Sequence, residues 1–317
     1  MRIVLLAEEA AGLRVLRALN SRKEDVAAVV TTVDTKNASQ ISIAKVAAAQ
    51  GYEVLPAGKL SMPGLAKFLE AERVDILLNV HSLHILPPPV IGAPQVGSFN
   101  LHPGPLPEFA GLNAPSWAIF LGAKEHAVTL HWMLKGIDTG PIAFAERFAL
   151  SQDDTGVSVT AKCVAAGVPL IEKLLDAAHR SVSEIPRISQ NGNRRRFFKA
   201  SDIPNNGWID WTSSANQIAG FVRAADYGPF NSPWGSPQFS LDKRVFGVVK
   251  AAAQTCSYDA VPGTVVAVKE SFVSVVAGVG ALQIEYLKSE NRVFNAAEIL
   301  RLGQVLGSSK PEHSSVS

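Results

Sequence analysis

The chain has only two cysteines, Cys163 and Cys256, and they lie far apart without the spacing of metal ligands. This scarcity provides no disulfide framework and favours reduced thiols, as in a cytoplasmic protein. Nor does the sequence contain about twenty consecutive apolar residues free of charges and breakers, so we expect no membrane span. Its apolar beginning ends after Ala7 at Glu8, too early for a secretory signal, and we interpret it as a first strand. These absences favour a globular protein of the cytoplasm.

A strong charge of either sign is also missing. The formal net charge is only +2 at pH 7, with a pI near 8.5, which argues for neither nucleic acid nor an anionic membrane as a partner. The compact basic run is Arg194–Arg196 with Lys199. It has two interpretations, a solvated connector or a contact with an acidic partner or substrate.

The glycine-rich loops that hold phosphate groups are missing too. The turn after the first strand, Ala7–Gly12, contains two acids and a single glycine, which would repel a pyrophosphate. A phosphate loop of the form GxxxxGK followed by Ser or Thr does not occur. The sequence therefore lacks the loops that usually bind nicotinamide cofactors, flavin cofactors or ATP.

The sequence does contain short apolar runs that alternate with segments of helical spacing from Arg2 to Val80. This alternation predicts an α/β fold with a parallel sheet covered by helices on both faces. Later in the chain, short β-rich runs separated by glycine turns predict a small barrel. We expect a first domain at residues 1–200 with a linker at about 181–204, a second domain at residues 205–306, and a polar tail at residues 307–317.

Two stretches of the first domain carry the candidate chemistry. In Val96–Gly111, VGSFNLHPGPLPEFAG, Asn100 and His102 leave a strand that the following prolines end. The second stretch, Met133–Ile142, MLKGIDTGPI, contains Asp138. Because ligands bind beyond the carboxyl ends of strands in open sheets, we expect this amide, imidazole and carboxylate to meet at neighbouring strand ends.

The two stretches together resemble the family of formyltransferases that use 10-formyltetrahydrofolate. In that family Asn-x-His, a few residues and Leu-Pro are followed by an Asp-x-Gly loop, as in Asn100–Pro107 and Gly136–Gly140 here. The region after residue 200 is similar to the small C-terminal domain of the methionyl-tRNA formyltransferase branch. The resemblance implies a Rossmann-like catalytic domain followed by an OB-like barrel. One departure is Pro103-Gly104, where that branch usually has Gly-Ser.

The resemblance also implies roles for individual residues. Asn100 and His102 would stabilise a tetrahedral intermediate, and Asp138 would orient His102, favour its imidazolium form and help to collect the proton of the amine. The folate pocket would involve Leu86, Val90, Gly136, Ile137 and Asp138, and the acceptor would lie near Gly104, Pro105, Leu106 and Asn113. No metal is expected, because His81 and His84 lack a third ligand of suitable spacing.

The sequence leaves the acceptor of the formyl group open. We expect a small or carrier-bound primary amine, amino-acid-derived or an amino sugar, because Ala110–Ala118 looks like formylation domains of peptide-assembly enzymes and relatives acting on small amines. Neighbouring biosynthetic domains are compatible with this view. Initiator tRNA is disfavoured because Thr31–Ser42 has one lysine and one aspartate, too little charge to hold several phosphates. Methionyl-tRNA formyltransferase and formyltetrahydrofolate hydrolase are the alternatives, whereas a folate-binding pseudoenzyme would need a broken triad.

Overall fold

The computed structural model describes residues 1–33, 42–57, 61–82, 84–290 and 292–310. Most of the segment Thr31–Ser42, expected to be a short and nearly neutral loop, lies outside the described residues, as does much of the expected polar tail. Contacts divide the chain into two compact units. The first consists of Met1–Gly111, Glu125–Ala149 and Thr160–Phe197, and the second of Leu112–Lys124, Leu150–Val159 and Phe198–Ser317.

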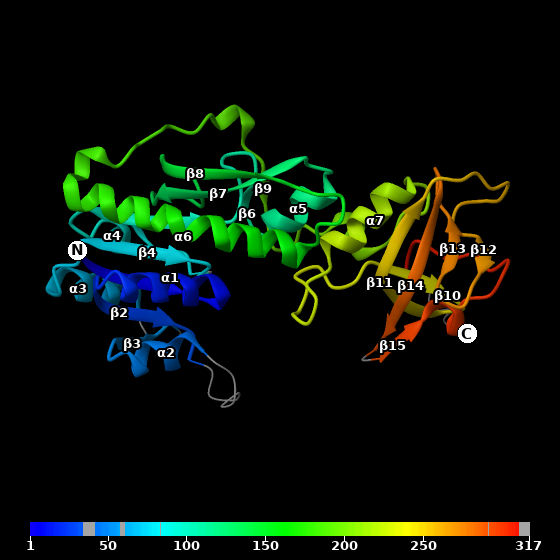
Figure 1. Ribbon diagram of the computed structural model, residues 1–317, viewed down its shortest axis with the longest axis horizontal. Helices are drawn as coiled ribbons and strands as arrows, with labels where there is room; N and C mark the ends of the chain where they lie inside the picture. Colours follow the sequence, from blue (N-terminus) through cyan, green and yellow to red (C-terminus); the bar gives the residue numbers. More distant parts are fainter. Residues whose placement is uncertain (34–41, 58–60, 83, 291, 311–317) are drawn as a thin grey trace, which may run out of the picture. The chain divides into compact units, whose positions relative to one another are not determined.

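A seven-stranded sheet forms the centre of the first unit, in the order β3-β2-β1-β4-β5-β7-β8 (Figure 1). Its strands are β1 (Arg2–Ala7), β2 (Asp25–Thr31), β3 (Glu53–Pro56), β4 (Ile76–Val80), β5 (Gly97–His102), β7 (Glu125–Trp132) and β8 (Ile142–Ala149). The strands from β3 to β5 in this order are parallel, whereas β7 is antiparallel to both β5 and β8. The Rossmann-like α/β fold is confirmed, with a mixed rather than an all-parallel sheet.

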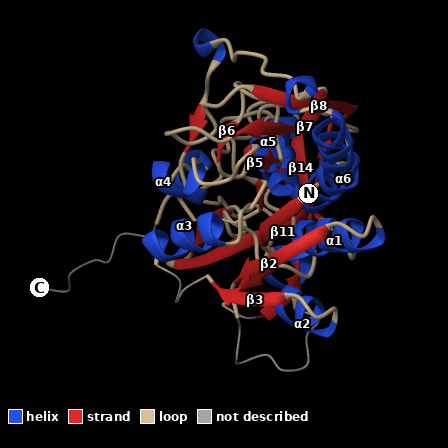
Figure 2. Ribbon diagram, turned by 90° about the vertical axis from the view of Figure 1, so that its left-hand side faces the viewer, coloured by secondary structure: helices blue, strands red, loops and turns tan. Residues whose placement is uncertain are grey.

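Helices cover both faces of this sheet, as the sequence predicts. Figure 2 shows one group on one side, α1 (Glu9–Ser21), α2 (Ile43–Ala49) and α6 (Gly156–Arg180), and another on the opposite side, α3 (Met62–Ala71) and α4 (Pro88–Ile91). The central strands are accordingly apolar, and all five residues of β4 are buried. The helix α3 begins where the hydroxyl of Ser61 accepts the Gly64 N–H at 3.2 Å. Among the described residues, no helix is long and apolar enough to cross a membrane.

The direction of β7 corrects the expectation that Asp138 follows a strand end next to the one that carries His102. In β7, Trp132 pairs with Phe99 and Thr129 pairs with His102, so β7 ends beside the beginning of β5. A parallel pair needs a crossover connection, usually a helix. The helix between these strands, α5 (Ala114–Phe120), belongs to the second unit and is not such a crossover. The loop after β7 therefore does not start at the strand end that carries His102, and it must turn back to reach it.

The second unit contains an antiparallel half-barrel, which confirms the predicted barrel-like domain. Its strands are β10 (Gln238–Leu241), β11 (Arg244–Gln254), β12 (Val265–Val268), β13 (Val273–Val276), β14 (Ala281–Ser289) and β15 (Arg292–Asn295). The helix α7 (Ala215–Ala224) packs against β11 and β14 and begins with a capping box of Ser214 and Gln217, and α8 (Ala296–Ile299) follows β15. A core around Trp211, Phe239 and Phe246 fills the half-barrel.

The segment expected to be a linker has local structure. It contains the short 3-10 helices η1 (Val182–Glu184), η2 (Gly192–Arg194) and η3 (Pro204–Gly207), and the two-residue strand β9 (Phe197–Phe198), which pairs with β6 (Ala110–Gly111). By contacts, residues 112–124 and 150–159 belong to the second unit, whereas the predicted boundary near residue 200 follows the order of the chain. That boundary stays a prediction.

Candidate active site

The strand β5 places Asn100 and His102 on one face of the sheet, because alternate residues of a strand point to the same side. Asn79 on the neighbouring strand β4 donates its amide N–H to Asn100 Oδ1 at 3.0 Å. That hydrogen bond orients the Asn100 amide, so its Nδ2 points to the other partners. Nδ2 lies 3.1 Å from His131 Nε2 and 3.3 Å from Asp138 Oδ1.

Asp138 reaches this face from the loop between β7 and β8. Its Oδ2 accepts the backbone N–H of Gly111 at 2.8 Å and lies 3.5 Å from His102 Nδ1. Its Oδ1 lies 3.3 Å from His131 Nε2. Asn100, His102, His131 and Asp138 thus form one cluster, which we call the polar network. The three residues that the sequence brings forward therefore meet in space, while their catalytic roles stay predictions.

His131 is a fourth member that the two sequence motifs do not include, although its place in the strand pattern is a signal for it. The strand pattern of β7 places Thr129 and His131 on the same face, and His131 lies directly opposite Asn100 in the antiparallel pair. Its Nδ1 lies 2.8 Å from the carbonyl oxygen of Trp132, so this nitrogen carries the proton. The other nitrogen, Nε2, is then available to the Asn100 amide. The pairing could not be predicted while β7 was taken to end at the same rim as β5.

Burial controls the protonation of His102, which exposes only 3% of its surface. Its Nε2 lies 2.6 Å from the carbonyl oxygen of Phe109 and must donate a proton to it. Burial lowers the pKa of His102 below its ordinary value, although the Asp138 carboxylate and the Phe109 carbonyl act in the opposite direction. Asp138 favours the imidazolium form, as expected, but burial outweighs this effect and the neutral form of His102 is favoured in the resting protein.

Asp138 remains ionised despite being 8% exposed. Burial on its own raises the pKa of its carboxyl group. The interactions with the imidazoles of His102 and His131 and the hydrogen bond from the Gly111 N–H outweigh this effect, so the pKa of Asp138 falls well below its ordinary value. The polar network thus combines a neutral imidazole with a carboxylate at a 3.5 Å separation.

Steric and conformational constraints explain why glycines occur in the Asp-x-Gly loop. A Cβ atom at Gly140 would lie 1.7 Å from the carbonyl oxygen of Trp132, a distance that no side chain tolerates. Gly136 has a φ of +112°, a region that glycine adopts without strain. These two positions let the loop turn back tightly over β7, and the turn brings Asp138 to the polar network.

The predicted folate-binding residues differ in exposure. Leu86 and Val90 are 5% and 0% exposed and belong to the core cluster of the first unit with Leu6 and Leu77. By contrast, Ile85 exposes 75% of its surface and Ile137, next to Asp138, exposes 43%. These exposed apolar side chains follow β4 and β7, the strands that carry Asn79 and His131. The involvement of Leu86, Val90, Gly136 and Ile137 in folate binding stays a prediction.

The predicted acceptor residues lie in two units. Gly104, Pro105 and Leu106 are buried in the first, and the Gly104 carbonyl accepts the Thr129 hydroxyl at 2.7 Å. Asn113 belongs to the second unit and precedes α5 with a φ of +59°. We expected it to cap this helix, but its side chain makes no capping hydrogen bond, because the residue adopts the left-handed rather than the extended conformation. Acceptor binding by these four residues stays a prediction.

His81 and His84, the histidines considered as metal ligands, are not part of a metal-binding group in the described structure. His81 Nδ1 lies 3.2 Å from Glu9 Oε2, and the two residues form an ion pair when His81 is protonated. In the described part of the chain, no group of three or more His, Cys, Asp or Glu side chains is placed to hold a metal ion. That the protein needs no metal stays a prediction.

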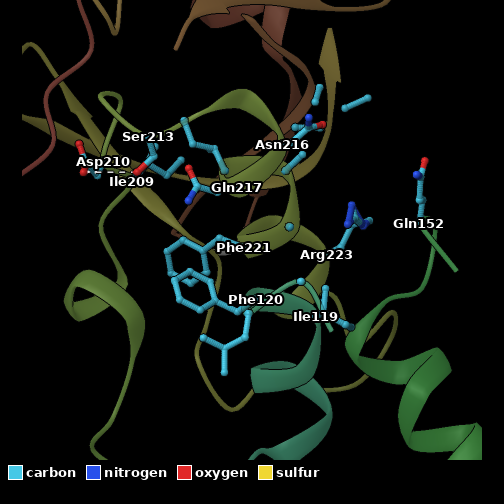
Figure 3. Close-up of a pocket in the computed structure, with 18 of the residues that line it drawn as sticks. Ile119, Phe120, Gln152, Ile209, Asp210, Ser213, Asn216, Gln217, Phe221 and Arg223 are labelled. Carbon is cyan, nitrogen blue, oxygen red and sulfur yellow. Dashed lines mark hydrogen bonds between the residues drawn. The ribbon is translucent and has the colours of Figure 1, made fainter. Parts of the chain in front are cut away.

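A separate pocket of about 840 Å³ lies within the second unit (Figure 3). It is lined by α5, α7 and β11, with Phe120 and Phe221 close together and Asn216 and Arg223 on α7. None of its lining residues belongs to the polar network. Burial lowers the pKa of Arg223, and Asp153 and Asp154 counteract this effect. No histidine is among the residues that line this pocket, so we place the candidate active site at the polar network, where an imidazole lies beside a carboxylate.

Comparisons with known families match both parts of the chain. The model of the formyl transferase family matches residues 1–174, and the model of the formyl transferase C-terminal domain matches residues 203–302. The methionyl-tRNA formyltransferase of Myxococcus xanthus is 29% identical over 294 residues, which cover 90% of each chain. That of Sorangium cellulosum is 29% identical over 259 residues, 81% of this chain and 80% of the relative.

Solved structures share the fold. An N-formyltransferase from Helicobacter canadensis, in complex with folinic acid and dTDP-3-aminofucose, has a TM-score of 0.68 at 17% identity, covering 89% of this chain and 97% of its own. HypX from Aquifex aeolicus, in complex with tetrahydrofolic acid, has a TM-score of 0.64 at 16% identity. The match covers 94% of this chain but only 46% of HypX. At such identities the likeness concerns the fold alone.

Proposed function

This chain belongs to the formyl transferase family and is a formyltransferase, and from that premise we propose that it transfers the formyl group of 10-formyltetrahydrofolate to a primary amine. The acceptor is a small or carrier-bound molecule, amino-acid-derived or an amino sugar. The observation that carries the proposal is the polar network, in which a buried neutral His102 lies 3.5 Å from an ionised Asp138 beside an oriented amide.

The surroundings of the polar network fit a folate. Ile85 and Ile137 offer exposed apolar surface that a planar ring system could cover, and Gly136 leaves the loop backbone without a side chain beside them. When bound, 10-formyltetrahydrofolate supplies an already activated formyl amide. The chain therefore needs no serine or cysteine nucleophile, and its residues have only to stabilise charge and move protons.

His102 accepts the proton of the attacking amine in this proposal. Its Nε2 proton is held by the Phe109 carbonyl, so the lone pair of the neutral ring is on Nδ1, which faces Asp138. Once protonated, the ring donates to Phe109 and Asp138 at the same time, which stabilises the imidazolium during the reaction. The same proton then passes to the nitrogen that leaves the formyl carbon, so the proton balance is restored.

Asn100 donates to the oxyanion that develops on the formyl oxygen. Both hydrogens of its Nδ2 have acceptors within the polar network, His131 Nε2 at 3.1 Å and Asp138 Oδ1 at 3.3 Å. An oxyanion is a stronger acceptor than a neutral imidazole nitrogen, so it replaces His131 in the transition state. A donor of this kind typically lowers a barrier by about 3 kcal/mol.

The proposal is tested by incubating the protein with 10-formyltetrahydrofolate and a panel of amines. Mass spectrometry of the amines should show the addition of one formyl group, and the Asp138→Asn variant should abolish most of it. Free formate without any formylated amine would instead assign the hydrolase reaction. Neither formylated amine nor formate above the level of a blank would refute the proposed function.

Methionyl-tRNA is the second candidate acceptor, favoured by a specific observation. The two methionyl-tRNA formyltransferases match 81% and 90% of this chain at 29% identity. The same assay therefore includes charged initiator tRNA. If the rate with tRNA exceeds that with every amine at equal concentration, the small-acceptor proposal is wrong and the second candidate replaces it.

A further inference from the structure

The segment from Ile188 to Arg196, which we call the strap, runs beside the Asp-x-Gly loop of the same unit. The strap is attached at Ile188, whose backbone exchanges two hydrogen bonds with Ile142 at 2.8 and 3.0 Å. Two positions further on, Gln190 Nε2 donates to the carbonyl oxygens of Gly140 at 2.6 Å and Asp138 at 3.1 Å. One amide group thus holds both ends of the Asp138–Gly140 turn.

Arg195 reaches the same turn from the other end of the strap. Its guanidinium donates to the carbonyl oxygen of Asp138 at 3.1 Å and to that of Ile137 at 2.8 Å. The Asp138 carbonyl therefore accepts from two side chains at once. Because Arg195 is charged, its hydrogen bonds are of the stronger kind.

Asp138 needs such support because its backbone is in an unfavourable conformation. Its φ is +52°, in the left-handed region that residues other than glycine rarely adopt. Residues held there are strained and persist only where the surroundings fix them. The carboxylate alone cannot fix the backbone, since its partners in the polar network contact only the end of the side chain.

The other arginines of the run serve different contacts. Arg194 forms an ion pair with Glu108 at 2.7 Å, and its side chain is 65% exposed. Arg196 contributes backbone groups, donating to the Pro107 carbonyl at 3.2 Å and accepting from Ala110 at 3.0 Å. Arg194 therefore offers a matched control, an arginine of the same strap that does not touch the loop of Asp138.

We propose that Gln190 and Arg195 are positioning residues of the formyl transfer reaction, because together they fix the backbone of Asp138 so that its carboxylate meets His102 and Gly111. The inference rests on the proposed function for its kinetic consequence. Its structural content, that the strap places the Asp138 carboxylate, can be measured without turnover. The basic run is on this view neither a solvated connector nor a phosphate contact at Arg195.

The kinetic experiment compares Gln190→Ala, Arg195→Ala and Arg195→Lys with Arg194→Ala. We expect the two alanine variants of the positioning residues to lower kcat between about tenfold and a hundredfold, since a displacement of 1 Å can cost about a hundredfold. KM for the formyl donor should change little. Arg195→Lys retains a cation but not the paired N–H groups, so it should be intermediate, and Arg194→Ala should match the wild type.

A double-mutant cycle separates positioning from general loss of structure. In an Asp138→Asn background, Gln190→Ala and Arg195→Ala should lower kcat by less than about twofold, because they act through a group already removed. Losses that multiply independently with Asp138→Asn would overturn the inference. Thermal unfolding of each variant identifies any that fails to fold, and in that case the remaining strap variant decides.

Hydrogen exchange of the Gly111 amide provides the test that needs no activity. This N–H is donated to Asp138 Oδ2, so it reports whether the carboxylate stays in place. We expect faster exchange of Gly111 in Arg195→Ala and Gln190→Ala, and unchanged exchange in Arg194→Ala. Unchanged Gly111 exchange in folded strap variants refutes the inference even if the wild type transfers formyl groups. Faster exchange in a protein without transferase activity supports the inference and refutes only the proposed function.

Discussion

Within the polar network, single side chains have separable tasks. Asn100→Ala removes the donor to the oxyanion, His102→Ala removes the proton acceptor, and Asp138→Asn removes the charge that stabilises a protonated ring. Each should reduce kcat about a hundredfold or more while binding of the formyl donor largely persists. Steady-state kinetics together with equilibrium binding of the donor would measure both effects.

The three losses should not add, since the residues act on one transition state. Asn79→Ala is a graded companion variant, because it removes only the hydrogen bond that orients Asn100 and should cost less than Asn100→Ala. A folded His102→Ala protein with near-normal turnover would show that the proton takes another route.

His126, a second buried histidine, makes the stability of the fold sensitive to acid. It is 0% exposed, its Nε2 donates to the Pro103 carbonyl at 2.9 Å, and burial lowers its pKa from 6.5 to about 4. Between these two pH values the unfolded chain binds a proton that the folded chain does not. The free energy of unfolding should therefore be unaffected above pH 6.5 and fall by about 3 kcal/mol as the pH decreases to 4.

Urea unfolding at several pH values measures this decrease. The His126→Gln variant retains a possible donor to Pro103 but does not titrate, so its free energy of unfolding should fall less over the same range. The difference between the two proteins isolates His126, because His102 and Asp138 have lowered pKa values in both and contribute in the same direction. Identical pH dependence of the two proteins would contradict the assignment.

Residue types and their order were sufficient to find Asn100, His102 and Asp138. A strand end followed by prolines, and an Asp-x-Gly loop, can both be recognised from the sequence alone. His131 and Asn79 could not be found in the same way. Their positions depend on which residues lie opposite Asn100 across two strand pairs, and no local pattern encodes that register. The neutral state of His102 was also beyond the sequence, since it depends on burial.

At the scale of elements, β7 supports the loop that follows His102. Thr129 donates its hydroxyl to the Gly104 carbonyl at 2.7 Å, and His126 holds the preceding carbonyl of Pro103. Thr129 is 1% exposed, so Thr129→Val leaves a buried carbonyl without this donor and should cost about 1–3 kcal/mol of unfolding free energy. Chemical denaturation measures the loss, and Thr129→Ser, which keeps the hydroxyl, should lose clearly less. Equal losses in the two variants would mean that the methyl group, and not the hydrogen bond, stabilises this strand pair.

The order of strands and helices up to β4 was predictable because apolar runs and helical spacing alternate regularly there. The direction of β7 was not. Its burial pattern, with seven of eight residues buried, suits a central strand of either direction. The antiparallel direction accompanies the placement of α5 in the second unit, where it is no crossover helix of the sheet, and this tertiary property is not revealed by the helix sequence.

For the whole molecule, the remaining question is how a large polyanion could be held. The net charge is only +2, and part of the compact basic run is engaged within the first unit, since Arg194 pairs with Glu108 and Arg195 holds the loop of Asp138. Residues 34–41, within the segment predicted to be too weakly charged for tRNA, lie outside the described residues. Two methionyl-tRNA formyltransferases nevertheless share 29% identity with this chain. Overall similarity and available charge therefore point to different acceptors.

Salt dependence distinguishes the two acceptors. Binding through several phosphate contacts loses roughly a thousandfold or more in affinity between about 50 and about 200 mM salt, whereas a small amine in a polar site forms no such contacts. We expect kcat/KM for the preferred amine to change less than about threefold over this range, and methionyl-tRNA to be a poor substrate at both salt concentrations. Initial rates with each acceptor at the two concentrations measure this. Arg194→Ala is the informative variant, because Arg195→Ala should slow the reaction with any acceptor. Efficient formylation of methionyl-tRNA that falls steeply with salt and with Arg194→Ala would establish a phosphate contact at the strap and refute the small acceptor.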